Sequence, residues 1–512
     1  MIERILTVGG FTLVSRLTGF VRDIVMAAIL GAGPIADAFL VAQRLPNHLR
    51  AIFAEGAFNA AFVPAYARVR TQKGEETVRV FADRIFTLML ATQVVILIAA
   101  LVFMPFVVEA LAPGFTHDPG RFTLAVELTR ITFPYLLLMT LVTLYSGILN
   151  ARERFAAAAA APIMLNVGMV ATLACAFLFP TAGHAAAWGV LIAGCLELII
   201  VTVDAQRVGA TTRPRWPRWD DDLKRFFKAL GPAVVGSSGV QLALLADTII
   251  ASFLTAGAIS ALYYADRLNQ LPIGVIGIAA GTVVLPEMAR RLAAGDEAGA
   301  LHAQNRAIEF TLILSIPCVA AFLLVPDVIM RGLFARGAFT AADAAAAGAT
   351  LAAYTIGLIP FVLIRSVTAT FLARGDTWTP VKATLGAAVV NIAFKVMLMG
   401  PLAQVGLALA TAIGAWINFG LVVWFARRAG LFAVDDRLRS SAVRLAAAGA
   451  ALAVALWLAS TPVMALVSTM PRLRNEAALA LLALIGAAVY GGFVLAFFGR
   501  AWLGRKPVVG SQ

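Results

Sequence analysis

Residues 15–64 read SRLTGFVRDIVMAAILGAGPIADAFLVAQRLPNHLRAIFAEGAFNAAFVP, and this stretch sets charged side chains inside apolar segments. Crossing a bilayer takes about 20 mostly apolar residues per helix, so the stretch can form two crossings joined near GAGP. An arginine at the centre of a lipid-facing helix costs roughly 2.5 to 3.5 kcal/mol. Because Arg16, Arg22 and Asp23 share the first segment, we expect them to face the inside of a helical bundle.

The composition of the whole chain agrees with a membrane protein. Of its 512 residues, 61% are hydrophobic and 13% are charged, whereas an average soluble chain is about 45–50% apolar and about 25% charged. The 42 glycines and 22 prolines are not gathered into low-complexity tracts, which excludes disordered and fibrous classes. The three cysteines lie in apolar runs and form no disulfide framework or metal-binding spacing. We therefore predict an all-α polytopic membrane protein.

Apolar windows along the chain predict fourteen transmembrane helices. They centre on residues 14–30, 37–63, 88–111, 131–149, 162–179, 188–203, 234–254, 273–285, 310–325, 352–371, 384–399, 406–425, 443–458 and 477–498.

The distribution of basic residues predicts the orientation. With alternate loops assigned to alternate sides, 28 of the 41 lysines and arginines fall on one side, 5 on the other and 8 inside spans. Basic loops stay on the cytoplasmic side, so we expect both termini to be cytoplasmic. Basic loops facing anionic headgroups also account for the net charge of +13 without a nucleic-acid partner.

The chain also contains a weak internal repeat. Leu30, Arg44, Pro64 and Arg152 recur as Leu254, Arg267, Pro286 and Arg374 at offsets of 222 to 224 residues. The offset spans six predicted helices, and an even number implies two halves inserted in the same orientation with a site between them. We predict an N-lobe at residues 1–206, a cytoplasmic amphipathic linker at 207–230, a C-lobe at 231–428 and two additional helices within 429–512. Within the linker, residues 213–230 are expected to form a helix on the inner membrane surface.

Eight basic residues lie within predicted spans and are candidates for binding. They are Arg16, Arg22, Arg44, Arg50, Arg130, Arg267, Arg365 and Lys395. A surplus of positive charge in a central cavity indicates an anionic ligand, and arginine presents a planar fork suited to phosphate or carboxylate. The alternative is internal ion pairing, for which Asp23, Asp37 and Glu55 are available partners.

Helical geometry relates these groups to each other. Arg16 and Asp23 are seven residues apart and share a face of the first helix, while Arg22 lies about 120° away. In the second span, Asp37 precedes Arg44 by seven residues and Arg50 follows Arg44 by six. Arg44 and Arg130 lie near helix ends, where a long side chain can reach the interface, so they are weaker candidates.

Other motifs add little chemistry. There is no GxxxxGK[ST] phosphate loop, and the four histidines are scattered, which argues against an ATP-driven pump and a zinc site. Gly274, Gly277 and Gly281 are spaced as for close helix packing. Asp247 is a lone carboxylate in mid-span that is either protonated and silent or takes part in coupling to an ion.

Residues 15–64 closely resemble the N-terminal signature of the MurJ (MviN) family, the lipid II flippases of bacterial cell-wall synthesis. The stretches YYADRLNQLPIGVIGIAAGTVVLP, LFARGAFT and GDTWTPVK, at residues 263–286, 333–340 and 375–382, resemble later family segments. The resemblance implies the MOP exporter fold, with two six-helix lobes in a V around a central cavity. It also implies a lipid-tail groove formed by the last two helices.

By the same resemblance, the substrate-binding arginines are Arg16, Arg22, Arg50 and Arg267. The supporting acidic or polar residues are Ser15, Asp23, Asp37 and Glu55, with Arg44 as a possible additional basic residue and Asp247 as a possible coupling-ion residue. No cofactor or metal is expected, although coupling to membrane potential or a monovalent cation is possible.

The resemblance implies a transporter of the bacterial inner membrane, not an enzyme, which moves lipid II from the cytoplasmic to the periplasmic leaflet by alternating access. Its expected partners are lipid II, membrane lipids and other cell-wall synthesis proteins. One alternative is an exporter of another polyprenyl-linked glycan or of drugs. A second is a polytopic glycan polymerase or glycosyltransferase, which should carry a carboxylate cluster in a large periplasmic loop; no such loop is predicted.

Overall fold

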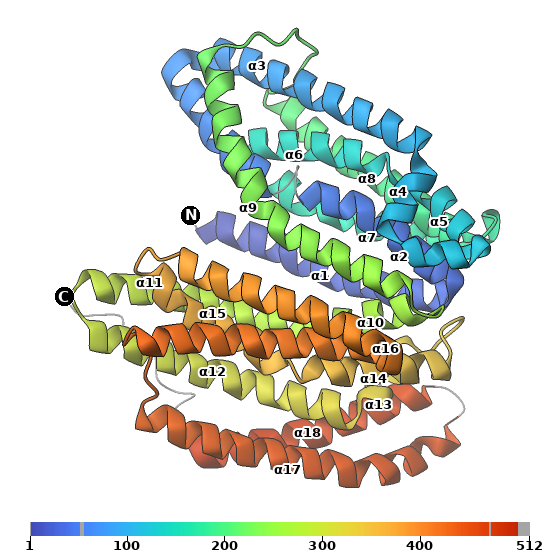
Figure 1. Ribbon diagram of the computed structural model, residues 1–512, viewed down its shortest axis with the longest axis vertical. Coiled ribbons are helices and arrows are strands. Elements are labelled where there is room, and N and C mark those ends of the chain that lie inside the picture. The colour runs from blue at the N-terminus through green and yellow to red at the C-terminus, as the bar shows by residue number, and fades with distance from the viewer. Residues whose placement is uncertain (1, 52–55, 471–472, 500–512) are drawn as a thin grey trace. The chain divides into compact units, whose positions relative to one another are not determined.

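The computed structural model describes residues 2–51, 56–470 and 473–499, and these residues form helices without a strand (Figure 1). This confirms the expected all-α class. The first nine helices are α1 (Ile2–Leu30), α2 (Pro34–Arg50), α3 (Gly56–Val102), α4 (Met104–Leu111), α5 (Pro119–Thr132), α6 (Tyr135–Ala151), α7 (Ala156–Ala174), α8 (Ala182–Arg207) and α9 (Asp221–Ser252).

The remaining helices are α10 (Ala258–Pro272), α11 (Ile278–Ala293), α12 (Glu297–Leu324), α13 (Pro326–Phe334), α14 (Ala341–Thr355), α15 (Leu358–Leu372), α16 (Trp378–Arg428), α17 (Asp436–Leu466) and α18 (Arg474–Phe498). A short π-helix, Ile273–Gly277, joins α10 to α11.

In this described part of the chain, nine helical segments are long and apolar enough to cross a membrane. Two of them contain a reversal, at Gly74 in α3 (φ 82°) and at Ala403 in α16 (φ 46°). The two arms of α16 run antiparallel, because Gly406 approaches Leu398 and Gly414 approaches Asn391 across the turn (Figure 1). Each of the fourteen predicted apolar windows overlaps a helix that the structure describes. That the chain crosses the membrane fourteen times, with two six-helix lobes, remains a prediction.

The chain divides into two compact units. Unit 1 contains Met1–Ser260 and Arg336–Phe339, and unit 2 contains Ala261–Ala335 and Thr340–Gln512. Helix α9, which we expect to open the second half of the repeat, packs against α3 within unit 1. The boundary between the compact units therefore lies after α9, whereas the second half of the sequence repeat begins with this helix.

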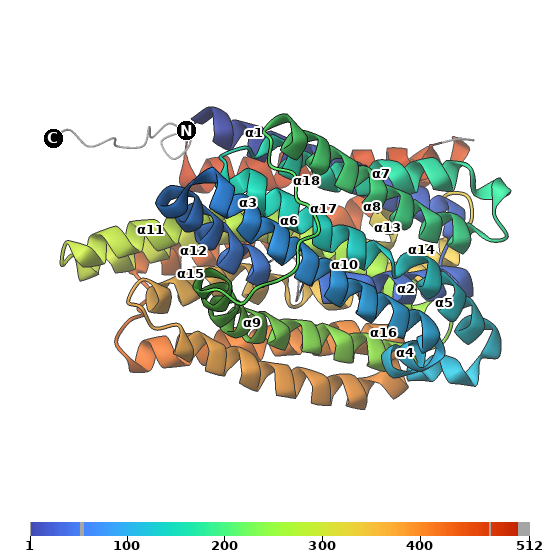
Figure 2. The same cartoon turned by 90° about the horizontal axis from the view of Figure 1, so that it is seen from above.

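The expected surface helix at residues 213–230 is only partly correct. Residues 210–220 are not helical and form a strap between α8 and α9, and the helix begins at Asp221 (Figure 2). Pro214 and Pro217 lack backbone N–H groups and restrict the residues before them, which explains why the helix starts late. Asp220 caps α9 by accepting a hydrogen bond from the backbone N–H of Leu223, three residues later.

The strap is attached to α3 through its backbone. The N–H groups of Arg213 and Arg215 donate to Oδ1 of Asp83 and Oγ1 of Thr87, both at 2.8 Å. The Arg215 side chain also pairs with Asp83, its Nε lying 3.7 Å from Oδ2, and both arginine residues remain exposed.

The internal repeat reappears in the geometry of two turns. Glu153 ends α6 with a φ of 62°, and Gly375, 222 residues later, follows α15 with a φ of 79°. In both turns the next backbone N–H donates to a carbonyl five residues earlier, at 2.9 Å for Arg154 and 3.0 Å for Asp376. This pairing is a Schellman motif, so the two halves end corresponding helices in the same way.

An ion pair accompanies each of these turns. Arg152 in unit 1 pairs with Glu75, and Arg374 in unit 2 pairs with Glu297. Both residues of the second pair lie 222 positions after those of the first. The repeat therefore extends from helix termini to specific side-chain contacts.

Two glycines of unit 1 allow backbones to approach closely at equivalent points of the repeat. A Cβ added at Gly114 would lie 2.4 Å from the Ser252 carbonyl oxygen, and one added at Gly337 would lie 2.2 Å from the Ala28 carbonyl oxygen. Gly337 also has a φ of 58°, which disfavours a side chain. Only glycine fits these two contacts without displacement.

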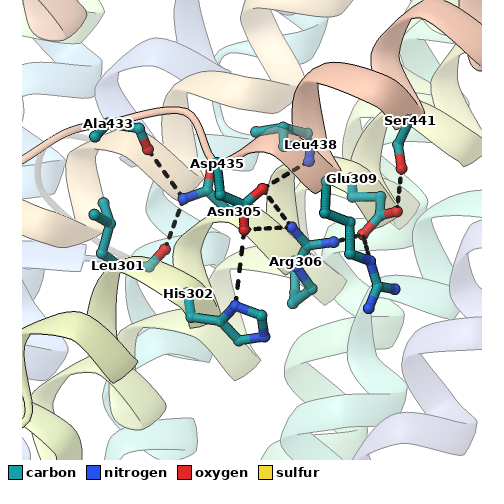
Figure 3. A network of polar contacts seen from close by, with 10 residues as sticks. Leu301, His302, Asn305, Arg306, Glu309, Ala433, Asp435, Leu438 and Ser441 are labelled. Atoms are coloured by element: carbon teal, nitrogen blue, oxygen red, sulfur yellow. Dashed lines mark hydrogen bonds and ion pairs between the residues drawn. The ribbon is translucent and has the colours of Figure 1, made fainter.

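Within unit 2, a polar network fastens the start of α17 to α12 (Figure 3). Arg306 contacts both carboxylate oxygens of Asp435 at 2.6 Å and also pairs with Glu309, which accepts from Ser441. Burial alone raises the pKa of Asp435, but the Leu438 N–H and the Arg306 guanidinium outweigh it and hold that pKa below its usual value. The carboxylate is thus ionised at neutral pH and fixes the first turn of α17.

Gly114→Ala and Gly337→Ala are expected to destabilise the protein, because the new methyl group must displace backbone. Overpacking of this kind costs about 1–3 kcal/mol, so the thermal unfolding temperature of the purified full-length protein should fall. Gly33→Ala is the matched control, since a Cβ at Gly33 would meet nothing within 4 Å. Equal unfolding temperatures for all three variants would contradict the close approach.

Candidate substrate-binding site

The Arg22 side chain is buried between α1 and α7 and is fully engaged. Its Nε and Nη2 atoms lie 3.1 and 2.7 Å from Oδ1 of Asp23, and its Nη1 donates to Oδ1 of Asn166 at 3.1 Å. The Asn166 amide donates in turn to the Ser15 carbonyl oxygen at 3.0 Å. Although Arg16 and Asp23 share a helical face, the structure thus pairs Asp23 with its neighbour Arg22.

Arg16 lies on the same helix but in a different environment. It is exposed and makes no hydrogen bond or ion pair to the residues that the structure describes. On a regular helix it is about 9 Å and about 120° from Arg22. Leu13 and Leu17 are 59% exposed on either side of it. This face of α1 therefore offers a cation together with apolar surface, which suits an amphiphilic anion.

Polar side chains of α2 face α9. Arg44 Nη1 donates to Oγ1 of Thr248 at 3.2 Å, and His48 Nδ1 lies 3.1 Å from Oε1 of Gln241. Asp247 is half-buried and precedes Thr248 on α9. Arg44 and Asp247 are consequently brought to one helix interface.

The end of α2 carries another of the predicted binding arginines. Arg50 is half-buried in the last turn of the helix. Glu55, the predicted acidic neighbour, lies outside the described residues.

Asp37 is completely buried and accepts four hydrogen bonds. Oδ1 accepts from the backbone and hydroxyl of Ser260 at 2.9 and 2.6 Å, and Oδ2 accepts from Gly257 N at 2.7 Å and Arg121 Nη2 at 3.2 Å. Gly257 and Ser260 flank the start of α10, whose first N–H groups lack intrahelical partners. The Asp37 carboxylate therefore ties α2, α5 and the start of α10 together within unit 1.

Arg121 is the residue that sequence reasoning missed. Its guanidinium lies 4.2 Å from the centre of the Phe115 ring, and its side chain is 7% exposed. Arg121 is one of the five basic residues that the charge distribution assigns to the non-cytoplasmic side, and it lies 84 residues from its partner Asp37. No local signal in the sequence indicates a pairing over that separation.

Arg267 is an exposed residue of α10 in unit 2. Its guanidinium carbon lies 4.8 Å from the centre of the Tyr263 ring. A cation over an aromatic face is held in a defined orientation. Arg16 and Arg267 thus provide one exposed guanidinium on each unit, and both suit recognition of phosphate or carboxylate.

Among the described residues, no three histidine, cysteine or carboxylate side chains lie together as a group that could hold a metal ion.

Asp37→Ala is expected to lower the free energy of unfolding by about 3–5 kcal/mol, because it leaves Arg121 buried without its carboxylate. Arg16→Ala serves as the control and should stay within about 0.5 kcal/mol of the parent protein, since Arg16 is exposed. Chemical denaturation of both purified variants measures the difference. If the two variants unfold alike, Asp37 does not hold these helices together.

The chain matches a known protein family over most of its length. Residues 26–475 match the family described as "Lipid II flippase MurJ". A probable lipid II flippase MurJ of Rhizobium meliloti (strain 1021) is 41% identical over 506 residues, covering 97% of this chain and 94% of that protein. A second, from Haemophilus influenzae, is 35% identical and covers 87% of this chain and 90% of its own length.

Solved structures agree on the fold. A lipid II flippase MurJ in an inward closed conformation superposes with a TM-score of 0.80 at 23% identity, covering 97% of this chain and 99% of the other. An inward-facing MATE-family multidrug resistance transporter of the MOP superfamily gives a TM-score of 0.67 at 15% identity, over 83% of this chain and 95% of the other. Together with the sequence matches, these findings show that the chain belongs to the lipid II flippase MurJ family.

Proposed function

We propose that this protein flips lipid II, a disaccharide-pentapeptide carried on undecaprenyl pyrophosphate, from the cytoplasmic to the periplasmic leaflet. Family membership over residues 26–475 is the observation that carries the proposal. The exposed guanidinium groups of Arg16 and Arg267 support it, because a pyrophosphate is the kind of anion that they recognise. No bond is made or broken, so the protein acts as a transporter and not as an enzyme.

The residues proposed to bind the substrate are Arg16, Arg22 and Arg50 of unit 1 and Arg267 of unit 2. Arg22 differs from Arg16 and Arg267 because Asp23 already neutralises it. A pyrophosphate that reaches Arg22 therefore exchanges one anionic partner for another, which limits the cost of desolvating a new charge. Such an exchange favours reversible binding, as alternating access between two leaflets requires.

The undecaprenyl tail needs an apolar surface, and we assign it to α17 and α18. These helices pack together within unit 2 and follow the repeated part of the sequence. Val443, Trp457, Leu466 and Leu484 are between 66% and 68% exposed along them. Because both helices lie outside the repeat, they are available for the lipid tail.

We place the protein in the bacterial inner membrane with both termini in the cytoplasm. The support is the 28 to 5 distribution of basic residues between alternate loops. In this orientation the strap at residues 210–220, with its exposed arginines, faces the cytoplasm.

Alanine at Arg16, Arg50 or Arg267 is expected to abolish flipping while the protein accumulates to near-normal levels. Each substitution removes charge-assisted hydrogen bonds to the pyrophosphate, and lysine keeps the charge but loses the planar fork. The measurement is the accessibility of lipid II to an external probe in cells that depend on the variant.

Arg22→Ala provides the contrast in this series. It takes the Arg22 guanidinium away from the buried Asp23 carboxylate, so it should lower thermal stability as well as transport. Normal lipid II export by all four alanine variants would refute the cationic site.

Asp247→Asn tests coupling to membrane potential or a monovalent cation. If the Asp247 carboxylate takes part in coupling, the substitution should change how flipping depends on potential or on sodium, without abolishing substrate binding. Thr248→Val is the control at the same interface, because it removes the hydroxyl that faces Arg44 but leaves the carboxylate. An unchanged dependence in Asp247→Asn would return this residue to a structural role.

A further inference from the structure

Arg365 lies in the middle of α15, on the side that packs against α11 in unit 2. One turn before it, Val362 packs with Ile276 in an apolar cluster, and one turn after it, Ala369 packs with Val284 in a second cluster. The arginine thus interrupts an otherwise apolar helix interface. A charged side chain at an apolar helix interface is unfavourable unless a specific interaction or exposure to water compensates for it.

Two glycines of the facing segment make room for this side chain. A Cβ added at Gly277 would lie 3.2 Å from Arg365 Nε and 3.3 Å from its Cδ, and one at Gly281 would lie 3.8 Å from Cδ. Gly277 closes the π-helix Ile273–Gly277, and such turns occur frequently at functional sites. These glycines were expected to allow two helices to pack closely. In the structure, Gly277 and Gly281 leave room for the Arg365 side chain to lie against α11.

The guanidinium itself is exposed and has no hydrogen-bond or ion-pair partner in the described part of the chain. Its helix belongs to an apolar segment, Ala341–Leu372, that is long enough to span a membrane. Facing lipid there would cost roughly 2.5 to 3.5 kcal/mol. An exposed arginine in mid-span is therefore expected to face water, with its five N–H donors available.

We propose that Arg365 is an additional anion-binding residue that contacts a phosphate or carboxylate group of the transported lipid. The inference rests on the proposed function and extends it, because Arg365 lies outside the set Arg16, Arg22, Arg50 and Arg267. Both the pyrophosphate and the carboxylates of the peptide stem match the guanidinium fork. The aliphatic part of the Arg365 side chain packs on Gly277 and Gly281 and so orients the guanidinium before the substrate arrives. This reduces the conformational entropy lost on binding.

Binding to the full-length protein in lipid nanodiscs separates the two sources of negative charge. The probes are lipid II, undecaprenyl pyrophosphate, and undecaprenyl-pyrophosphoryl disaccharide without the peptide. Arg365→Ala should weaken binding about tenfold or more, the effect of losing a hydrogen bond to a charged group. Weaker binding of all three probes assigns the contact to phosphate, and weaker binding of lipid II alone assigns it to a peptide carboxylate.

Two glycine substitutions test the position of the guanidinium without removing it. Gly277→Ala should lower affinity because its methyl group pushes on Nε, whereas Gly281→Ala makes an ordinary contact and should stay within about twofold. Arg365→Lys should restore part of the affinity that alanine loses, which a purely structural role would not require.

Arg130→Ala, at another exposed arginine within an expected span, controls for the loss of a positive charge. If Arg365→Ala binds every probe as tightly as the parent protein, the proposal is overturned. If the parent protein itself binds none of the probes, the proposed lipid II transport fails, and that outcome is distinguishable from a failure of Arg365.

Discussion

A charged side chain within an apolar helix needs either an ion-pair or hydrogen-bond partner or exposure to water. This constraint accounts for where the charged side chains of the helices lie. Asp37 and Arg22 meet it by pairing: Asp37 accepts four hydrogen bonds at 0% exposure, and Arg22 has a carboxylate and an amide around it. Arg16 and Arg365 meet it by exposure, without a partner among the described side chains. Asp37 and Arg22 therefore hold helices together, and a ligand that reaches Arg22 must replace an existing partner, whereas Arg16 and Arg365 have no described partner to replace.

This division shows that a count of charges in the spans does not assign individual roles. Arg22 and Arg16 are six residues apart on one helix, and composition treats them alike. Burial separates them, because only Arg22 reaches Asn166 of α7, which is 144 residues away in the chain. Tertiary packing thus decides which of the two arginines already has a protein partner.

The sequence predicts those features of the fold that depend on hydrophobic periodicity, composition and the internal repeat. The apolar windows locate the helices, and the matched arginines at 152 and 374 mark turns that prove to share one motif. The sequence does not predict the strap, where two prolines and backbone contacts to Asp83 and Thr87 replace the first turns of an expected helix. It also does not predict the partner of Asp37, because Arg121 becomes a neighbour only when α2 and α5 pack.

The same carboxylate shows how a duplicated chain can benefit from divergence. At an offset of 223 residues, which also relates Arg44 to Arg267, the repeat aligns Asp37 with Ser260. These two residues contact each other in unit 1, with the Ser260 hydroxyl donating to Oδ1 of Asp37 at 2.6 Å. Two aspartates at these positions would repel each other in a buried site. A serine in the second half instead supplies a donor, so the loss of strict repetition at this point favours the contact between Asp37 and Ser260 within unit 1.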